Sequence, residues 1–443
     1  MKTMKLKKFR VEKLFNTFDH EIEINSLGIT IVIGENGIGK TVVLEMLEAI
    51  FNKHFNYLYQ VIFNKIFLEF DDGDIWLIEK SEEKKKNIPI VTLQHISSKT
   101  NKTSKITLFK FDKNDFSISG FVAQHPYLRR MGLNVWQDIR TGDTLTREDM
   151  LERYNDELMA GLFLNEPSEL PPQIMEKIQH NNVSLIKTQR LLYIDERNRS
   201  RTAPVKTVAK YSEDLKVLIK SSLAQSTDLS SKLDRTYPNR MIEKINRSEE
   251  SKTDDITSEL KRLEEKRELL DKVGLIEIDK ESKLQEIEEN QKENETLKYV
   301  LQLYIEDSFE KLKIFDEPSQ KIKMFLDIIN KRFKHKKMFI DKEKGFLFKS
   351  TILLENEIPV DKLSSGEQNE LVLFYELLFK SNKDSLILID EPEISLHISW
   401  QNTFIHDLKE IAKLNDLTFL IATHSPDIIS NNWDLRVELK GVE

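Results

Sequence analysis

The sequence of 443 residues contains no cysteine. Disulfide bonds, thiolate metal sites and cysteine nucleophiles are therefore excluded, and the composition fits a reducing compartment such as the cytoplasm. No stretch approaches the ~18 consecutive apolar residues that a membrane-spanning helix needs. The N-terminal segment 1–15 is basic, but it lacks the apolar run and the small-residue cleavage site of a secretory signal. We therefore expect a cytoplasmic protein without a membrane partner.

An excess of basic residues is also missing. The formal net charge is −8, which gives no support to a generally basic nucleic-acid-binding protein, although a local basic face is compatible with it. Hydrophobic residues make up 39% of the sequence, enough for a core, and the 32% of charged residues suit a helix-rich soluble protein. At this length we expect two structural units, or one domain with a large insertion.

The first 111 residues are predicted to form mostly strands around one early helix. A β-branched run at 28–34 ends in glycine and predicts a buried strand, and 41–55 carries apolar residues at helical spacing. Four further apolar segments predict an added antiparallel sheet, with Asp-Asp-Gly as a turn between two of them. These segments are 66–70, 74–80, 88–96 and 105–111.

The middle of the chain contains a charged helical segment. A core strand is predicted at 183–194, and from about residue 205 to 330 the sequence becomes helical and highly charged. Apolar residues follow a short, gapped heptad spacing on both sides of a break at Gly274. This spacing predicts a helical hairpin that resembles a short coiled coil, whose second helix includes Leu284 and Ile287.

The C-terminal part alternates strands and helices. Short strands are predicted within 337–363, and a helix begins near Gly366. The apolar strands at 385–390 and 417–424 are separated by a helix, an order that implies parallel pairing through a right-handed crossover. The predicted fold is therefore α/β, with an added antiparallel sheet and the helical hairpin as an insertion.

A glycine-rich segment connects the first predicted buried strand to the first predicted helix. Residues 34–41, GENGIGKT, match the pattern G-x-x-x-x-G-K-[ST] in full, in the required context of a preceding strand and a following helix. The glycines allow backbone N–H groups to face phosphate oxygens at the helix N-terminus. We expect Lys40 to reach the β- and γ-phosphates of ATP and Thr41 to bind Mg²⁺. The predicted nucleotide contacts are Gly34, Glu35, Asn36, Gly37, Ile38, Gly39, Lys40, Thr41 and Val42.

Two acidic residues follow the apolar run that begins at residue 385. Asp390 is predicted to hold Mg²⁺, and Glu391 to polarise the attacking water as a general base. Lys40 and Asp390 lie near opposite ends of the sequence, so the site must be assembled from both ends. Everything between these ends is then an insertion.

The segment LSSGEQ, residues 363–368, opens the helix that precedes this acidic strand. Taken alone, such a segment is a helix N-cap. Given its order relative to Asp390, the chain resembles the ABC ATPase superfamily, whose signature is LSGGQ, or LSGGE in SMC-like members. The resemblance implies that this segment contacts the γ-phosphate of ATP bound to a second copy, although Ser365 stands where the family has glycine. The implied cofactor-binding residues are Ser364, Ser365, Gly366 and Glu367.

The same resemblance assigns three further elements. His424, in the string THSP after a predicted strand, matches the switch histidine that senses the γ-phosphate. Residues 393–397 would then form the D-loop at the dimer interface. Gln189, in KTQRLLYI, is the first candidate for the Q-loop glutamine that contacts Mg²⁺ or the attacking water. Gln124, in VAQHPY, is the competing candidate.

Order, spacing and motif strings together resemble the SMC/RecF/OLD branch of ABC ATPases. Within it, the segments 185–194, 224–240 and 363–379 resemble compact ATPases of bacterial anti-phage loci, such as the PtuA-type ATPases of Septu systems and retron-associated relatives. This resemblance implies ATP and Mg²⁺ as cofactors and an ATP-dependent head-to-head dimer or higher oligomer. It also implies an effector encoded next door, such as an HNH nuclease.

These motifs divide the chain into three parts. Residues 1–200 and 336–443 are expected to form the N-terminal and C-terminal parts of an ATPase head, and 201–335 the helical insertion. The insertion contains no metal-nuclease pattern, and only a short segment follows His424. We therefore expect a separate chain to cut any nucleic acid.

The predicted function is an ATP-hydrolysing regulatory subunit of an anti-phage defence system. The alternative is a DNA repair or recombination ATPase that clamps DNA between dimerised heads, with the basic segment 331–337 as the contact face. A transporter ATPase fits poorly, because the motifs are widely separated by a long helical insertion. DNA thus stays a candidate partner.

Overall fold

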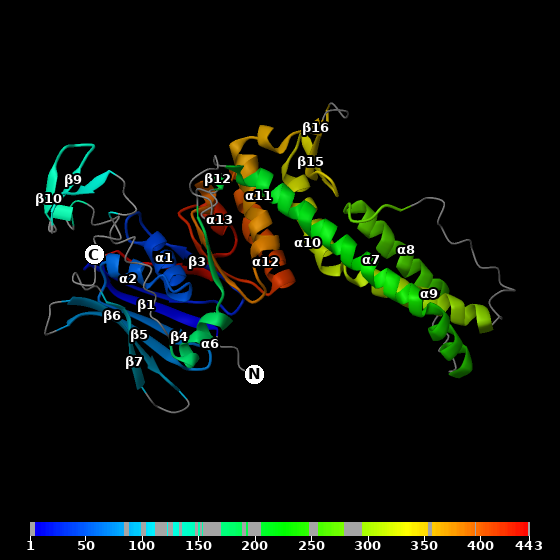
Figure 1. Ribbon diagram of the computed structural model, residues 1–443, viewed down its shortest axis with the longest axis horizontal. Helices are drawn as coiled ribbons and strands as arrows, with labels where there is room; N and C mark the ends of the chain where they lie inside the picture. Colours follow the sequence, from blue (N-terminus) through cyan, green and yellow to red (C-terminus); the bar gives the residue numbers. More distant parts are fainter. Residues whose placement is uncertain are drawn as a thin grey trace. The chain divides into compact units, whose positions relative to one another are not determined.

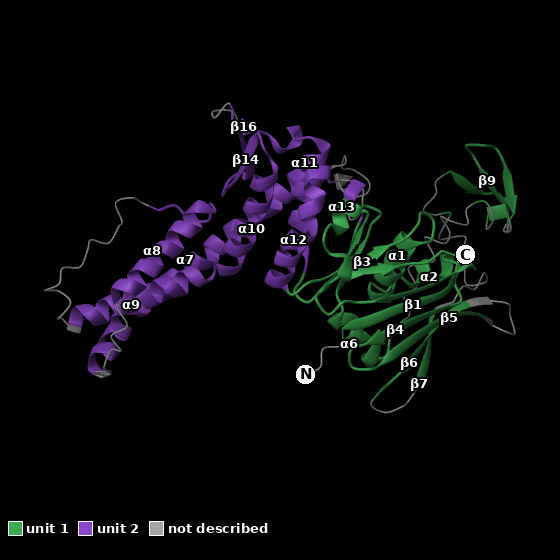
Figure 2. Cartoon of the chain, turned by 180° about the vertical axis from the view of Figure 1, so that it is seen from behind, with its two compact units in different colours: residues 1–186, 382–392, 416–443 green, residues 187–381, 393–415 purple. Residues whose placement is uncertain are grey.

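Figure 1 shows the computed structural model of the chain. The structure describes residues 5–83, 88–98, 103–110, 122, 127–132, 135–146, 149–150, 153, 170–187, 192–193, 205–247, 256–278, 295–352, 357–394 and 396–441. The chain forms two compact units, coloured separately in Figure 2. Unit 1 contains residues 1–186, 382–392 and 416–443, and unit 2 contains residues 187–381 and 393–415.

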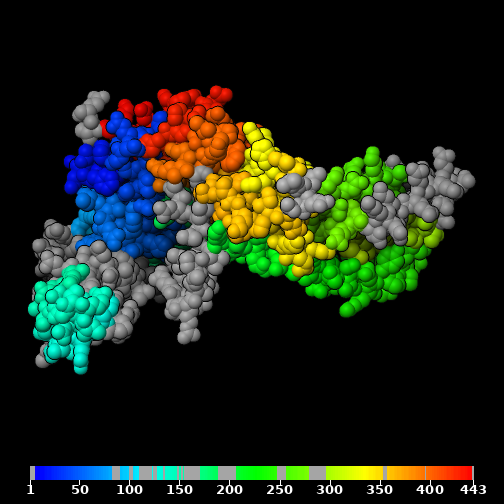
Figure 3. All heavy atoms as spheres, turned by 90° about the horizontal axis from the view of Figure 1, so that it is seen from above, coloured from blue at the N-terminus to red at the C-terminus, as the bar shows by residue number. Residues whose placement is uncertain are grey.

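Unit 1 contains a five-stranded sheet in the order β11-β17-β18-β3-β19, in which every neighbouring pair is parallel. The β17 strand is buried at every position, as expected for a parallel strand covered on both faces. Because β18 pairs with β3, segments from the two ends of the sequence lie side by side (Figure 3, red and blue). The strands are β3 (Ile29–Ile33), β11 (Val183–Ile186), β17 (Leu386–Asp390), β18 (Thr418–Ala422) and β19 (Arg436–Glu438).

The predicted antiparallel sheet is confirmed and is larger than expected. It has six strands in the order β2-β1-β4-β5-β6-β7, because the first two strands of the chain join the four predicted ones. Burial alternates along β4, which shows that one face of the sheet is fully covered and the other is partly exposed. The strands are β1 (Leu6–Leu14), β2 (Phe18–Glu23), β4 (Lys65–Phe70), β5 (Ile75–Glu83), β6 (Ile88–Ile96) and β7 (Thr103–Lys110).

The helix α1 (Lys40–Phe51) joins both sheets into one core. It buries most of its side chains, and α2 (Phe55–Gln60) packs beside it. The rings of Phe51, Phe70 and Trp76 meet in this core, with the Phe70 and Trp76 centroids 4.9 Å apart. A single hydrophobic cluster contains residues of α1 and of both sheets. The start of α1 is thereby held firmly at the end of β3.

Smaller elements complete unit 1. A three-stranded antiparallel sheet contains β8 (Leu128–Arg130), β9 (Val135–Asp138) and β10 (Thr144–Thr146). The helix α6 (Pro172–His180) precedes β11, and α13 (Pro426–Ile429) and a 3₁₀ turn (Trp433–Leu435) follow β18. In the described part of either unit, no helix is long and apolar enough to cross a membrane.

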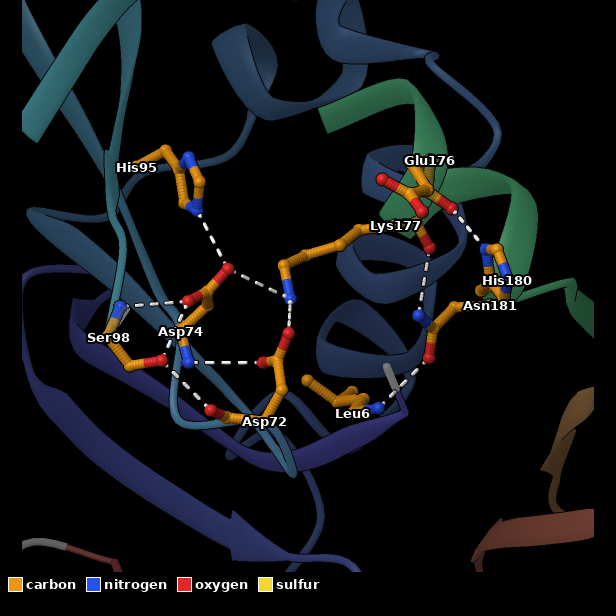
Figure 4. Close-up of polar contacts among 9 residues, drawn as sticks. All are labelled: Leu6, Asp72, Asp74, His95, Ser98, Glu176, Lys177, His180 and Asn181. Atoms are coloured by element: carbon orange, nitrogen blue, oxygen red, sulfur yellow. Dashed lines mark hydrogen bonds and ion pairs between the residues drawn. The ribbon is translucent and has the colours of Figure 1, made fainter. Parts of the chain in front are cut away.

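A buried polar cluster fixes α6 to the antiparallel sheet (Figure 4). The Lys177 ammonium lies 2.6 Å from an Asp72 oxygen and 3.2 Å from an Asp74 oxygen, and its side chain is only 2% exposed. His95 and Ser98 also contact the Asp74 carboxylate. Burial alone would raise the pKa of Asp74, but the bonds from Ser98, His95 and Lys177 outweigh it and lower this pKa to about 2. The cluster therefore places two carboxyl groups around one cation.

Unit 2 contains the helical insertion. The long helix α7 (Thr207–Arg247) packs against α9 (Glu295–Lys313), and α9 packs against α8 (Ile256–Lys272). The insertion is thus confirmed as helical, but its main element is a helix of 41 residues that precedes the predicted hairpin. The predicted positions Leu284 and Ile287 lie outside the described residues.

The remaining elements of unit 2 lie before and after α11 in the sequence. The helix α10 (Asp316–Arg332) leads into a three-stranded antiparallel sheet of β14 (Lys336–Asp341), β15 (Gly345–Ser350) and β16 (Glu357–Ile358). A 3₁₀ turn (Val360–Lys362) precedes α11 (Ser365–Tyr375), which continues as a π-helical segment (Glu376–Lys380). After a second 3₁₀ turn (Pro392–Ile394), α12 (Ile398–Asn415) connects β17 to β18.

The predicted core strand at 183–194 is wrong in its extent. Only Val183–Ile186 joins the parallel sheet, whereas β12 (Leu192–Tyr193) pairs antiparallel with β13 (Val205–Lys206) in a separate two-stranded sheet. Polar residues separate the two apolar stretches, so each stretch pairs with a different strand.

A buried charge network ties three helices of unit 2 together. Arg332 at the end of α10 donates to the carboxylates of Glu370 on α11 and Asp407 on α12, and it also stacks over the ring of Phe374. The Glu370 side chain is fully buried. Burial raises the pKa of Glu370 to about 7, although Arg332 opposes this shift. The network therefore contains a carboxyl group that titrates near neutral pH.

We predict that Lys177→Met destabilises the protein by about 3–5 kcal/mol, because it leaves two buried carboxylates without their cation. Chemical denaturation followed by tryptophan fluorescence measures the change. The matched control combines Lys177→Met with Asp72→Asn and Asp74→Asn, which removes the stranded charges and should recover part of the loss. Equal stability of the single variant and the wild type would show that the cluster contributes nothing.

We also predict a pH-dependent effect of Glu370→Gln. The folded pKa of Glu370 lies above its unfolded value of 4.5, so folded protein binds the proton more tightly and loses stability as pH rises from about 4.5 to about 7. Over this range the wild type should lose about 3 kcal/mol relative to the variant. Thermal unfolding measured across these pH values tests this, with the exposed Glu410→Gln on α12 as control. Parallel pH profiles for the wild type and Glu370→Gln would contradict the prediction.

Candidate functional site

The phosphate loop spans the six residues between β3 and α1. Its backbone conformation favours glycine at two positions. Gly37 and Gly39 adopt positive φ angles of 85° and 96°, which side chains other than glycine rarely tolerate. A Cβ atom at Gly39 would also lie 2.6 Å from a methyl carbon of Leu14. No side chain caps the start of α1, so its first N–H groups present a positive end suited to an anion.

Lys40 is the first residue of α1 and is folded back over this loop. Its ammonium donates to the carbonyl oxygens of Gly34 at 3.0 Å and Glu35 at 2.9 Å, and lies 3.5 Å from Nδ1 of His424. The residue is 6% exposed. A cation held by neutral carbonyls at a helix N-terminus places concentrated positive potential where a phosphate chain can bind.

Thr41 and Asp390 are brought into direct contact. The Thr41 hydroxyl lies 3.0 Å and 3.1 Å from the two carboxylate oxygens of Asp390, the last residue of β17. Asp390 is 8% exposed. A hydroxyl and one carboxylate form the kind of sparse oxygen site that Mg²⁺ uses when phosphate oxygens and water complete its octahedron. The residues present therefore fit Mg²⁺.

Glu391 and His424 lie next to this pair. Glu391 has a positive φ of 42°, and its N–H donates to the carbonyl oxygen of Ala422, the last residue of β18, at 2.9 Å. Its carboxylate lies 3.8 Å from Nε2 of His424, and both side chains are 30% exposed. A strained backbone that turns a partly exposed carboxylate beside a histidine suits proton transfer from water.

The parallel sheet explains why these residues meet. The loop follows β3, the two acids end β17, and His424 follows β18, and these three strands are neighbours in the order β17-β18-β3. The carboxyl ends of parallel strands meet at one edge of the sheet, where α/β proteins bind ligands. Unit 1 therefore gathers Lys40, Thr41, Asp390, Glu391 and His424 from opposite ends of the sequence.

The signature segment belongs to unit 2, where it forms a capped helix start. The Ser364 hydroxyl accepts from the Glu367 N–H, and the Ser364 N–H donates to the Glu367 carboxylate, which makes a capping box. Lys336 on β14 donates to both carboxylate oxygens of Glu367 at 2.8 Å and 2.7 Å. A Cβ atom at Gly366 would meet no atom within 4 Å, so the approach to this residue is open.

Two of the predicted site residues, Gln189 and its competitor Gln124, lie outside the described residues. The Glu367 carboxylate, predicted to contact nucleotide, is engaged by the helix cap and by Lys336. Sequence reasoning missed Lys336, because it lies in a basic run that is typical of a solvated surface and nothing local marks its partner.

A family model described as AAA ATPase domain matches residues 4–429 of the chain. The spermidine/putrescine import ATP-binding protein PotA of Aster yellows witches'-broom phytoplasma (strain AYWB) is 28% identical over 86 residues, 17% of this chain and 20% of that protein. PotA of Onion yellows phytoplasma (strain OY-M) is 32% identical over 68 residues, 15% of this chain and 16% of that protein. The chain spans a fifth or less of the length of these curated relatives.

Solved structures of similar chains include two SMC heads. The SMC head domain from Thermotoga maritima is 12% identical, with coverage of 99% of this chain and 100% of that chain and a TM-score of 0.34. The SmcHead bound to the C-winged helix domain of ScpA is 11% identical, with coverage of 96% and 91% and a TM-score of 0.34. Because the family model covers nearly the whole sequence, the chain belongs to the AAA ATPase domain family.

Proposed function

We propose that the chain hydrolyses ATP as the regulatory subunit of a bacterial anti-phage defence system and acts with a separate effector. The observation that carries the ATPase part is the contact between Thr41 and Asp390, next to which His424 lies 3.5 Å from Lys40 and 3.8 Å from Glu391. These groups supply a phosphate cradle, oxygen ligands and a base within one edge of one sheet. Such an edge suits phosphoryl transfer to water.

Each side chain then has one task. The N-terminus of α1 and the Lys40 ammonium bind the phosphates of ATP, and leaving the carbonyls of Gly34 and Glu35 frees Lys40 to do so. Thr41 and Asp390 would hold Mg²⁺, which neutralises phosphate charge. Glu391 accepts the proton of the attacking water, and His424 beside it orients that water or the γ-phosphate.

A second copy of the chain is proposed to complete the site. The exposed serines at the start of α11 and the open approach to Gly366 present N–H and hydroxyl donors to a phosphate of another copy. Ile394 and Ile398, each 65% exposed, flank the proposed D-loop residue His397, and a second chain would cover them. We keep Gln189 as the proposed Q-loop glutamine.

The defence role rests on the resemblance of three segments to compact anti-phage ATPases. One of them, 224–240, lies on α7, where Arg240 donates to both carboxylate oxygens of Asp307 on α9. This segment therefore helps to pair the helices of the insertion. We propose that the insertion or the head carries an effector, such as an HNH nuclease, whose activity depends on the nucleotide state.

Replacing Glu391 with Gln is expected to lower ATP turnover by about 100-fold or more, because a positioned general base contributes roughly that factor. ATP binding should persist, since the phosphate loop is unchanged. Phosphate release and binding of a fluorescent ATP analogue measure the two properties, and Glu438→Gln at the exposed end of β19 is the control. Turnover in Glu391→Gln that stays within about twofold of the wild type would remove Glu391 as the base.

Replacing Ser364 with Arg should abolish hydrolysis while each chain still binds ATP, because the added side chain blocks the helix start that faces the other copy's nucleotide. Ser365→Gly, which restores the glycine of the related signature, is the matched variant and should stay active. Steady-state ATPase assays and analogue binding distinguish the two steps. Normal hydrolysis by Ser364→Arg would rule out a shared site.

The defence role is tested by phage plating on cells that carry the gene with its native neighbours. Lys40→Ala should lose protection, because the phosphates lose their cation. The same locus with Lys105→Ala, an exposed lysine on β7, should protect like the wild type. Absence of protection by the wild-type locus against a broad phage panel would oppose the defence role and leave the ATPase proposal standing.

A further inference from the structure

The hairpin of β14 and β15 presents a basic face with an aromatic ring. Lys337 pairs in register with Lys349, and Phe339 pairs with Leu347 two residues along. The ladder continues beyond the strands, where the Thr351 N–H donates to the His335 carbonyl oxygen at 3.1 Å. Since side chains alternate between the faces of a strand, Lys337, Phe339, Leu347 and Lys349 lie on one face. We call these four residues the hairpin face.

The opposite face of the same hairpin is part of the core. Met338 and Phe348 pair in register and are buried, as are Ile340 and Phe346. Asn330 on α10 bonds both the N–H and the carbonyl oxygen of Met338, at 2.6 Å and 3.0 Å. The buried side therefore fixes the strands, and the hairpin face is a rigid surface that needs no rearrangement to present its side chains.

The two lysines of the hairpin face have no ion-pair partner among the described residues. Glu357 on β16 pairs in register with Lys349, but its carboxylate is held by Lys344 at 2.8 Å. Other lysines around the hairpin are matched with acids, as in Lys342 with Glu277. Like charges placed directly opposite each other on a sheet destabilise it. The pairing of Lys337 with Lys349 therefore lowers the stability of the sheet, and the packing of the fold gives no reason for this pair.

An exposed ring lies between these charges. Phe339 is 39% exposed, and the ammonium groups of Lys337 and Lys349 lie 5.5 Å and 5.8 Å from its centroid. Positive charge around an accessible aromatic face matches a ligand that carries both regularly spaced phosphates and flat rings.

We propose that the hairpin face binds single-stranded nucleic acid. An unpaired base stacks on Phe339, and the flanking phosphates contact Lys337 and Lys349. A duplex buries the faces of its bases within its own stack, so only a single strand can use the ring. The surface lies within unit 2 and does not depend on the ATPase proposal.

Binding of a fluorescently labelled oligothymidine to the full chain, measured by polarisation without nucleotide, tests this inference. Lys337→Glu with Lys349→Glu should weaken binding by about 10-fold or more at low salt and reduce the slope of log affinity against log salt by about 1.4. Phe339→Leu should weaken binding by about fivefold or more, since it keeps apolar bulk but removes the stacking surface. Lys232→Glu with Lys272→Glu, two exposed lysines on α7 and α8, makes the same charge change elsewhere and should have little effect.

Three results would overturn the inference. The first is that the wild type does not bind the oligonucleotide. The second is that the hairpin and control charge variants lose equal affinity. The third is that the wild type binds duplex as tightly as single strand and that Phe339→Leu has no effect. Thermal unfolding checks that each variant is folded. If charge reversal disturbs the hairpin, Lys337→Gln with Lys349→Gln must show the same direction of change. Because no ATP is present, failure here leaves the proposed hydrolysis untouched, and a lack of hydrolysis leaves this binding test valid.

Discussion

The contact between the Thr41 hydroxyl and the Asp390 carboxylate is the constraint on which the rest of unit 1 depends. These residues lie near opposite ends of the sequence, so the chain must leave the nucleotide site and return to it. The strand order β17-β18-β3 achieves this with short apolar strands, in which Ile389 pairs with Ile421 and Ile421 with Ile31. Burial of these strands against α1 fixes their register, and the register places hydroxyl, carboxylates and imidazole together.

Unit 2 uses charge to hold its helices. Arg332 connects α10, α11 and α12 from within the core, while Lys336 connects β14 to the capping box of α11 at the surface. Lys336 therefore stabilises the start of α11 through Glu367, and Arg332 stabilises its middle through Glu370. Lys336 and Lys337 are neighbours on one strand but point to opposite faces, so this strand carries both the contact to Glu367 and a lysine of the hairpin face.

Much of unit 1 was predictable because its signals are local. Glycines at Gly37 and Gly39 report the backbone that the loop needs, and an apolar run that ends in Asp390 and Glu391 reports a buried strand with acids at its tip. The added antiparallel sheet follows from its short β-branched segments and turn. Assembly of Lys40 with Asp390 followed from motif order, although no local feature shows which strand lies between them.

The features that escaped prediction depend on distant partners. The strand predicted at 183–194 is interrupted because β12 pairs with β13 and not with the parallel sheet. The helix α7 is a single helix although Pro238 lies within it. The cluster around Lys177 and the pairing of Lys336 with Glu367 leave no mark in the sequence near either lysine. An isolated lysine is usually a solvated residue, so only the tertiary fold reveals which lysines are structural.

Sharing of one ATP site between two copies is tested most directly by mixing the Lys40→Ala and Ser364→Arg variants. Each variant alone lacks one half of every site, but a mixed dimer contains one intact combination, Lys40 of one copy with Ser364 of the other. We predict that ATP hydrolysis, absent from either variant alone, reappears in the mixture and rises with the fraction of mixed dimer. A mixture that stays inactive, although cross-linking shows that mixed dimers form, would contradict a composite site.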